Sequence, residues 1–294
     1  MGDFIIEVRG LKKSFKGQAA LDGLDLSVPA GSIFGFLGRN GAGKTTTIKI
    51  LMSLLRQDAG FASIFGSPAR NAIEARRRVG FVTEDKELYP YMTVEQIIRF
   101  TRPFFPKWRA DLERRYLEMF ELPRRKKIPD LSKGMRSKLM LLIAMSHEAE
   151  LLILDEPTEG LDPVGVEDIL RELVSLAAKD GTTVFFSSHQ LEEVEQIADQ
   201  IAIIDHGRAV VSGSLDDLKQ RYKRLNIVLQ QEMPAAVPWL DGAERVRQQG
   251  RTISFLAGRN VGALIEQAQS LPGSHVELFP VSLKDIFLEH VRGN

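Results

Sequence analysis

The residues best suited to chemistry form a glycine-rich segment that fits the phosphate-binding pattern G-x-x-x-x-G-K-[ST]. The segment consists of Gly38, Arg39, Asn40, Gly41, Ala42, Gly43, Lys44 and Thr45, and Thr46 follows it. Its glycines permit positive φ angles, so successive backbone N–H groups can surround an anion. Lys44 is expected to reach the β- and γ-phosphates of a nucleotide, and the Thr45 hydroxyl is expected to bind Mg²⁺.

The segments on either side of this loop have the patterns of a strand and a helix, as a phosphate site requires. Residues 33–37 are apolar and predict a short buried strand, whereas residues 46–55 carry apolar side chains at helical spacing. The N-terminus of that helix would add partial positive charge beside the phosphates. Several classes of nucleotide-binding protein share this arrangement, so the loop alone predicts phosphate binding without naming a function.

Two further predicted strands end in polar residues that could act on a bound phosphate. Residues 151–154 form an apolar run that ends in Asp155 and Glu156, and the carboxyl ends of parallel strands face the ligand crevice. Asp155 is expected to hold Mg²⁺ through water, and Glu156 is expected to polarise a water that attacks the γ-phosphate. His189 follows the strand predicted over residues 182–187, where it could contact the γ-phosphate.

Two other segments give weak signals when each is taken alone. Ser132 has the character of an N-cap for a helix over residues 133–145, and Gly134 lies in its first turn. A helix start of this kind also binds anions, although a plain capped helix explains the sequence equally well. Asp162 precedes a proline and by itself indicates only a turn.

Composition limits the classes of protein to which the chain can belong. The length of 294 residues fits one large domain or two unequal ones, and 44% hydrophobic residues are ample for a core. A formal net charge of zero gives no support to a nucleic-acid partner, and the lack of cysteine excludes disulfides and thiolate zinc sites. No apolar run approaches the roughly 20 residues that span a bilayer, so we expect a soluble chain that meets a membrane only through a partner.

The order of the predicted elements indicates an α/β fold with a second, smaller domain. Strands alternate with helices over residues 1–220, which predicts a mostly parallel sheet, and residues 4–8 and 20–28 predict an antiparallel β subdomain. A helical subdomain is expected over about residues 86–148. Residues 221–294 predict a small C-terminal α+β accessory domain, in which we find no catalytic constellation.

Taken together and in this order, the motifs resemble those of the nucleotide-binding subunit of ABC transporters, over residues 4 to 215. Residues 38–46 are similar to the Walker A segment of that family, 131–135 to its signature loop, 151–156 to its Walker B strand and 159–162 to its D-loop. The resemblance implies a P-loop NTPase fold, with ATP and Mg²⁺ as cofactors. It also implies that Phe15 stacks on adenine, that His189 is the switch histidine and that Asp162 helps to bind the nucleotide.

Two positions depart from the family's commonest pattern. Glu84 stands where the Q-loop has a glutamine that contacts Mg²⁺, and a carboxylate can still bind that ion. The signature reads Leu-Ser-Lys-Gly-Met in place of Leu-Ser-Gly-Gly-Gln, and it keeps Ser132 and Gly134, which contact the γ-phosphate in the family. This form of the signature and the ending over residues 282–288 resemble the bacterial ABC-2 export-type ATPases.

The resemblance implies an ATP-driven motor that works as a pair of subunits. Ser132 and Gly134 of one subunit are expected to cap the ATP held by Lys44 of the other, with Glu156 and His189 completing the catalytic set. The pair, most simply a homodimer, would close on ATP and open after hydrolysis. It would sit at the cytoplasmic face of the inner membrane and drive export through a separate polytopic permease, without a nucleic-acid partner.

Several alternatives stay open from the sequence alone. The aromatic residues within residues 89–108 could line a groove for the permease or could pack the helical subdomain. A soluble ABC ATPase acting on a ribosome or nucleic acid usually carries a second cassette, coiled coils or zinc modules, and an importer ATPase often has a larger appendix. A small-molecule kinase would leave residues 131–135 and His189 without explanation. The sequence does not identify the transported substrate.

Overall fold

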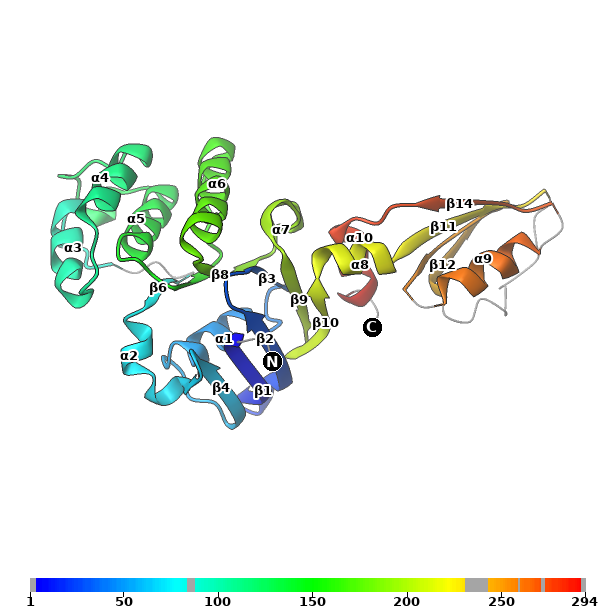
Figure 1. Cartoon of the computed structure of the whole chain (residues 1–294), viewed down its shortest axis with the longest axis horizontal. Coiled ribbons are helices and arrows are strands. Elements are labelled where there is room, and N and C mark those ends of the chain that lie inside the picture. Colours follow the sequence, from blue (N-terminus) through cyan, green and yellow to red (C-terminus); the bar gives the residue numbers. More distant parts are fainter. Residues whose placement is uncertain (1–3, 84–87, 231–242, 259, 271–272, 292–294) are drawn as a thin grey trace. The chain divides into compact units, whose positions relative to one another are not determined.

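The computed structural model describes residues 4–83, 88–230, 243–258, 260–270 and 273–291 (Figure 1). Glu84, one of the residues expected to bind metal, therefore lies outside the described residues. The chain divides into two compact units, Met1–Ser212 and Gly213–Asn294, whereas the sequence pattern changes near residue 220. Each unit has a hydrophobic core of its own.

The first unit begins with an antiparallel sheet whose strand order is β2-β1-β4-β5. The strands are β1 (Phe4–Phe15), β2 (Gln18–Pro29), β4 (Ala59–Ile64) and β5 (Ser67–Pro68). Lys16 and Gly17 join β1 to β2, both with positive φ, as a two-residue turn between right-handed twisted strands requires. The expected antiparallel pairing is present; β1 extends well beyond the predicted residues 4–8, whereas β2 is close to the predicted residues 20–28.

A six-stranded sheet forms the centre of this unit in the order β10-β9-β3-β8-β7-β6. Its strands are β3 (Ile33–Leu37), β6 (Val79–Val82), β7 (Leu151–Asp155), β8 (Thr183–Ser188), β9 (Gln200–Asp205) and β10 (Arg208–Ser214). Every residue of β3, β7 and β8 is buried, as expected for parallel strands covered on both faces. Leu37 pairs with Ser188 and Asp155 with Ser187, so the carboxyl ends of these three strands meet at one edge.

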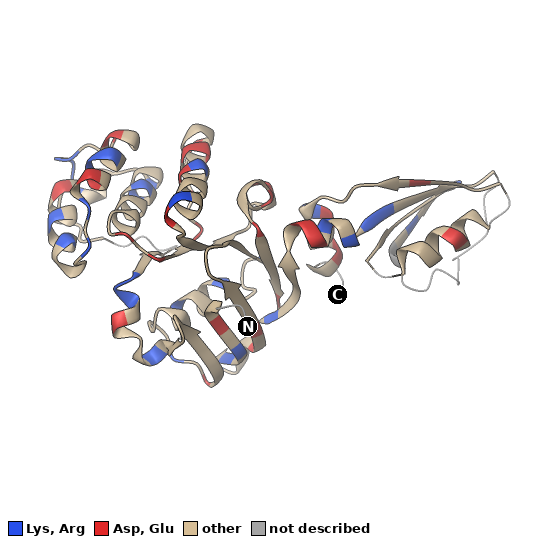
Figure 2. Cartoon of the chain, in the orientation of Figure 1, with Lys and Arg blue, Asp and Glu red and all other residues tan. Residues whose placement is uncertain are grey.

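The helices of the first unit fall into two groups. Helices α1 (Lys44–Leu51), α2 (Ile73–Arg76), α6 (Pro163–Asp180) and α7 (Leu191–Ile197) accompany the sheets, whereas α3 (Val94–Thr101), α4 (Ala110–Met119) and α5 (Lys133–Met145) form the helical subdomain. Thr93 and Gln96 make a capping box at the start of α3. Helices α3 and α4 carry both basic and acidic residues, whereas the charged residues of α5 are all basic (Figure 2).

The aromatic residues of the helical subdomain divide between its surface and its interior. Tyr89, Phe100 and Phe104 are exposed, and Phe100 contacts both of the others, with ring centroids 5.4 and 5.6 Å apart. Phe105 instead stacks on the buried ring of His147 at 4.0 Å. The surface residues are therefore available to a partner, whereas Phe105 packs the subdomain.

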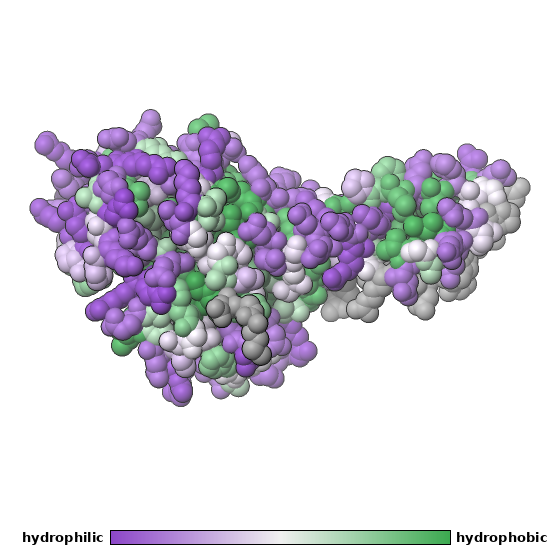
Figure 3. Space-filling model, in the orientation of Figure 1, coloured by the Kyte–Doolittle hydropathy of each residue, from purple (hydrophilic) through white to green (hydrophobic). Residues whose placement is uncertain are grey.

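The second unit contains α8 (Leu215–Arg221), a four-stranded sheet and helices α9 (Val261–Gln269) and α10 (Leu283–Val291). The sheet has the order β12-β13-β11-β14, with strands β11 (Lys223–Val228), β12 (Ala243–Gln249), β13 (Thr252–Ala257) and β14 (His275–Phe279). All three pairings are antiparallel, and α9 contributes Leu264 and Ala268 to the core. Hydrophobic residues also gather on the visible surface of this unit (Figure 3), whose exposed apolar side chains include Val228 and Leu278.

The fold confirms the predicted class, with a mostly parallel sheet, an antiparallel β subdomain, a helical subdomain and a C-terminal α+β unit. Elements that the sequence pattern did not predict include β4, β5, β10, α2 and α8. Within the described ranges, no helix combines the length and apolar character needed to cross a membrane.

Candidate active site

The glycine-rich loop joins β3 to α1 and lies against neighbouring backbone at two of its glycines. Gly43 has φ +112°, and a Cβ there would lie 2.7 Å from the Ala20 carbonyl oxygen. A Cβ on Gly38 would lie 2.6 Å from the Ile204 carbonyl oxygen. Only glycine lets the loop pass this close to the adjoining strands, so its sequence fixes the shape of the phosphate cradle.

Lys44 places a buried cation at the base of this cradle. The side chain is 6% exposed, and its Nζ donates a hydrogen bond of 2.8 Å to the Gly38 carbonyl oxygen. Its Nζ also lies 3.6 Å from Oε1 of Glu156, which is equally buried. Because a buried charge is costly without a partner, this pair holds the ammonium where a phosphate would arrive.

A cavity of about 450 Å³ opens above the loop. Its walls bring together most of the residues expected to hold the nucleotide, and they are Phe15, Gln18, Ala19, Ala20, Arg39, Asn40, Gly41, Gly43, Lys44, Thr45, Thr46 and Glu156. Phe15, at the end of β1, is 47% exposed, so its ring is available to stack on a base. The cavity therefore offers an aromatic surface, a backbone cradle and a cation in one place.

The carboxylates at the end of β7 are held by the end of β8. Ser187 Oγ donates a hydrogen bond of 2.5 Å to Oδ1 of Asp155, and it accepts one of 3.1 Å from the backbone N–H of Glu156. Glu156 has φ +49°, a left-handed conformation that is uncommon for a residue other than glycine. Such a conformation persists where the surroundings hold it, which marks Glu156 as a constrained residue.

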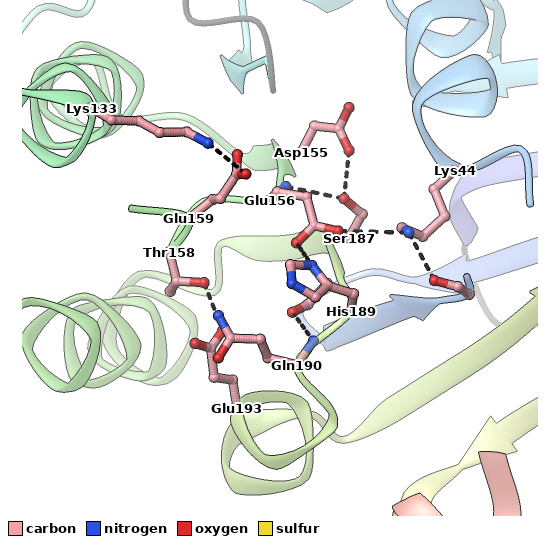
Figure 4. A network of polar contacts seen from close by, with 12 residues as sticks. Lys44, Lys133, Asp155, Glu156, Thr158, Glu159, Ser187, His189, Gln190 and Glu193 are labelled. Carbon is pink, nitrogen blue, oxygen red and sulfur yellow. Dashed lines mark hydrogen bonds and ion pairs between the residues drawn. The ribbon is translucent and has the colours of Figure 1, made fainter. Parts of the chain in front are cut away.

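His189 connects Glu156 to the loop that follows β8. Its Nδ1 lies 2.8 Å from Oε2 of Glu156, within hydrogen-bonding distance of the carboxylate. The imidazole side chain is 51% exposed, whereas that of Glu156 is 8% exposed. Figure 4 shows Lys44, Glu156 and His189 converging from three different elements at the carboxyl edge of the sheet. The Glu156 carboxylate, the His189 imidazole and the Lys44 ammonium thus meet beside the phosphate cradle.

The polar side chains of the signature segment (residues 131–135) and of Asp162 form hydrogen bonds at the starts of their own helices. The Ser132 hydroxyl caps α5 by accepting a hydrogen bond of 3.2 Å from the Met135 N–H. Asp162 caps α6 in the same way, accepting a hydrogen bond of 2.9 Å from the Gly165 N–H, which lowers the pKa of its carboxyl. Gly134 packs against the segment before α6, because a Cβ there would lie 2.5 Å from the Gly160 carbonyl oxygen. Among the described residues that line the nucleotide cavity, Ser132, Gly134 and Asp162 do not appear.

Comparison with known proteins places this site in a family. A family model described as ABC transporter matches residues 21–159, and one described as an AAA domain matches residues 127–195. The chain is 36% identical to the daunorubicin resistance ATP-binding protein DrrA3 of Streptomyces coeruleorubidus, covering 99% of this chain and 95% of that protein. The chain belongs to the ABC transporter ATP-binding proteins. It is accordingly an ATPase subunit with an ATP-binding P-loop domain.

Two further relatives extend the comparison. The chain is 33% identical to Nod factor export ATP-binding protein I of Ralstonia nicotianae (strain ATCC BAA-1114 / GMI1000), covering 97% of this chain and 92% of that protein. A solved structure of the ATP binding subunit of an ABC transporter is 32% identical, with a TM-score of 0.67, and covers 74% of this chain and 92% of its own. The predicted resemblance to ABC transporter subunits is confirmed.

The donor set of this ABC protein fits Mg²⁺ bound together with a nucleotide. Thr45 offers a hard oxygen atom at the cavity, and Asp155 offers another at the end of β7. Across the residues that the structure describes, no group of three or more His, Asp or Glu side chains forms a metal cage.

Three polar residues at the site were not predicted to have a role. Ser187 is buried between Asp155 and Glu156, and Thr158 donates a hydrogen bond of 2.7 Å to Oε2 of Glu193. The parallel register of β7 and β8 could have indicated Ser187, since both strands end at the same edge. The Thr158–Glu193 contact joins residues far apart in the sequence, and no spacing rule points to it.

A larger cavity, of about 1100 Å³, lies at the opposite, amino ends of β6, β7 and β8. There Arg78 stacks over the Phe65 ring at 3.9 Å and forms an ion pair of 2.5 Å with Glu150. The Arg78 guanidinium lowers the pKa of the Glu150 carboxyl. None of the phosphate-loop residues lines this cavity, so it is separate from the nucleotide site.

Proposed function

We propose that this ABC ATPase is the motor subunit of an exporter and that two copies close on ATP to drive a separate membrane permease. In this proposal Lys44 holds the β- and γ-phosphates, Glu156 is the general base and His189 contacts the γ-phosphate. Ser132, Gly134 and Asp162 reach the nucleotide from the opposite copy. Thr45 and Asp155, with Glu84 at the Q-loop position, would hold Mg²⁺, which when bound would neutralise charge on the phosphates.

The observation that carries the proposal is the division of the motif residues within one chain. The phosphate loop, Phe15 and Glu156 line one cavity, while Ser132, Gly134 and Asp162 lie outside it. A second copy related by two-fold symmetry would place each signature segment over the cavity of its partner. Two ATP molecules would then be held between the copies, and loss of the γ-phosphate would remove the contact that favours the closed state.

The contacts around Glu156 suit a base that is released when ATP binds. Oε1 of Glu156 faces the Lys44 ammonium and Oε2 faces His189. A triphosphate in the cradle would compete for Lys44, and the Glu156 carboxylate would then accept a proton from an attacking water. His189 then remains as the hydrogen-bond partner that keeps Glu156 in place.

Export and the permease partner are supported by relatives and by one surface. Proteins named for daunorubicin resistance and for Nod factor export are similar to this chain over nearly its whole length. The exposed aromatic side chains Tyr89, Tyr91, Phe100 and Phe104 offer an apolar docking surface on the helical subdomain. We assign this surface to a cytoplasmic helix of the permease, which would hold the ATPase at the inner face of the membrane.

The proposal is tested by the Glu156→Gln variant. It is expected to bind ATP, to hydrolyse it at least about a hundredfold more slowly, and to accumulate as a dimer, because ATP stays between the copies. Light scattering after gel filtration, with and without ATP and Mg²⁺, measures the dimer. The control is Glu74→Gln, an exposed acid of α2, which should keep normal turnover and show no trapped dimer. A Glu156→Gln protein that stays monomeric with bound ATP would contradict the two-copy motor.

A further inference from the structure

A third acid, Glu193, lies beside the Glu156–His189 pair and has no role in the mechanism above. It belongs to α7 and is 7% exposed. Its Oε2 accepts a hydrogen bond of 2.7 Å from the hydroxyl of Thr158, which is 2% exposed (Figure 4). Neither residue lines the nucleotide cavity, so the pair is buried next to the reacting groups without touching the substrate.

The position of the pair in the chain links two loops of the active site. Thr158 comes two residues after Glu156, and Glu193 comes four residues after His189. A single buried hydrogen bond therefore ties the segment that follows the base to the helix that follows the histidine. Burial raises the pKa of Glu193, and the nearby charge of Glu156 acts in the same direction. The charge of Glu156 thus influences the pKa of the Glu193 carboxyl.

The backbone of Glu156 needs support on both of its sides. On the amino side, its N–H donates to Ser187 Oγ at 3.1 Å. On the carboxyl side, the Glu159 N–H donates to the Glu156 carbonyl oxygen at 3.2 Å, and Thr158 lies inside that turn. Since φ of Glu156 is +49°, the turn relaxes toward ordinary backbone angles unless it is held. The Thr158 side chain is the point at which α7 holds it.

We propose that Glu193 is a positioning residue for catalysis. Through Thr158 it keeps Glu156 in the left-handed conformation and within hydrogen-bonding distance of His189. The inference rests on the proposed role of Glu156 as the base. Loss of the Thr158–Glu193 hydrogen bond leaves the phosphate cradle intact and misplaces the base, so it lowers kcat and leaves the KM for ATP unchanged.

The test compares Thr158→Val, Glu193→Met and Glu193→Gln in steady-state ATP hydrolysis. Thr158→Val and Glu193→Met each lower kcat by about ten- to thirtyfold, because a small misplacement of a catalytic group is costly. Both keep KM and nucleotide affinity within about twofold. Glu193→Gln stays within about threefold of the wild type, since its amide oxygen can still accept from the hydroxyl. The double variant Thr158→Val/Glu193→Met is no slower than either single variant, as expected for one shared contact.

Two controls separate positioning from a general loss of structure. Thr182→Val removes the hydroxyl of another buried threonine, which donates to the Ala149 carbonyl oxygen, and should keep kcat even where the melting temperature falls. Adding Thr158→Val to Glu156→Gln should lower the residual hydrolysis no further, because the base is already absent. A full additional loss in that background overturns the positioning role, as does an unchanged kcat in Thr158→Val. Wild-type turnover in Glu156→Gln alone instead refutes the proposed function.

Discussion

The two groups of motif residues in the first unit differ in how far one copy of the chain assembles them. Lys44, Glu156 and His189 are joined by contacts of 2.8 and 3.6 Å beside the nucleotide cavity. The side-chain oxygens of Ser132 and Asp162 instead accept hydrogen bonds that cap α5 and α6. The first group is an assembled site, whereas the second is a pair of helix starts.

This difference shows what a buried constellation and a surface motif each require. The first group, Lys44, Glu156 and His189, together with the phosphate loop, is called here the phosphate half of the site. It is shaped by contacts inside the chain, including the close approach of Gly43 to Ala20 and the constrained backbone of Glu156. The second group, Ser132, Gly134 and Asp162, is the signature half. It consists of helix N-termini, which attract anions by their exposed N–H groups and dipole. Such termini become a nucleotide site only when a phosphate is brought to them, and we expect the second copy to bring it.

The largest effect is expected from removing the cation of the phosphate half, the Lys44 ammonium. Lys44→Met should lower ATP turnover by at least about a hundredfold and weaken nucleotide binding by about tenfold or more, since a charge-assisted hydrogen bond is lost. A fluorescent nucleotide titration measures affinity, and phosphate release measures turnover. Lys179→Met, an exposed lysine of α6, serves as the control. Unchanged affinity in Lys44→Met would place the phosphates elsewhere.

The strands that carry the phosphate loop, Glu156 and His189 could be predicted because their apolar patterns are continuous. Strands β3, β7 and β8 are buried at every position, so their ends could be located in the sequence. Strand β4 was missed because Ala59, Gly60 and Ala62 are small and have little strand propensity. Strand β10 and helix α8 are short elements at the change of pattern near residue 220.

Other parts of the site could not be predicted because they depend on contacts between distant segments. Nothing in the sequence indicates that Glu156 adopts a positive φ, since that region is normally left to glycine. Glu193 is an acid on a helix that would ordinarily face solvent, and its burial follows from the hydroxyl of Thr158 in another loop. The roles of Ser132, Gly134 and Asp162 remain predictions, because they concern a second copy.

A smaller but more selective effect is expected from filling the space beside Gly134. A Cβ there would lie 2.5 Å from the Gly160 carbonyl oxygen, so Gly134→Ala should displace the start of α5 from the segment before α6. We expect ATP turnover to fall by about tenfold through misplacement of the signature segment, with ATP binding to the monomer unchanged. Gly165→Ala is the matched control, because its Cβ would meet neighbours at ordinary distances of 3.4 to 3.6 Å. Equal losses in both variants would argue against a specific signature contact.

The smallest expected effect concerns Lys133, the residue that replaces the usual first glycine of the signature. Its Nζ lies 2.6 Å from Oε1 of Glu159, and the two side chains are 60% and 31% exposed. An ion pair in this setting contributes about 0.2–1 kcal/mol, so Lys133→Met should lower the melting temperature by no more than about 4 °C. The difference should shrink as salt is raised from 0.05 to about 1 M, because salt screens exposed charges. A larger, salt-independent loss would mean that the signature half is assembled by buried contacts, as the phosphate half is.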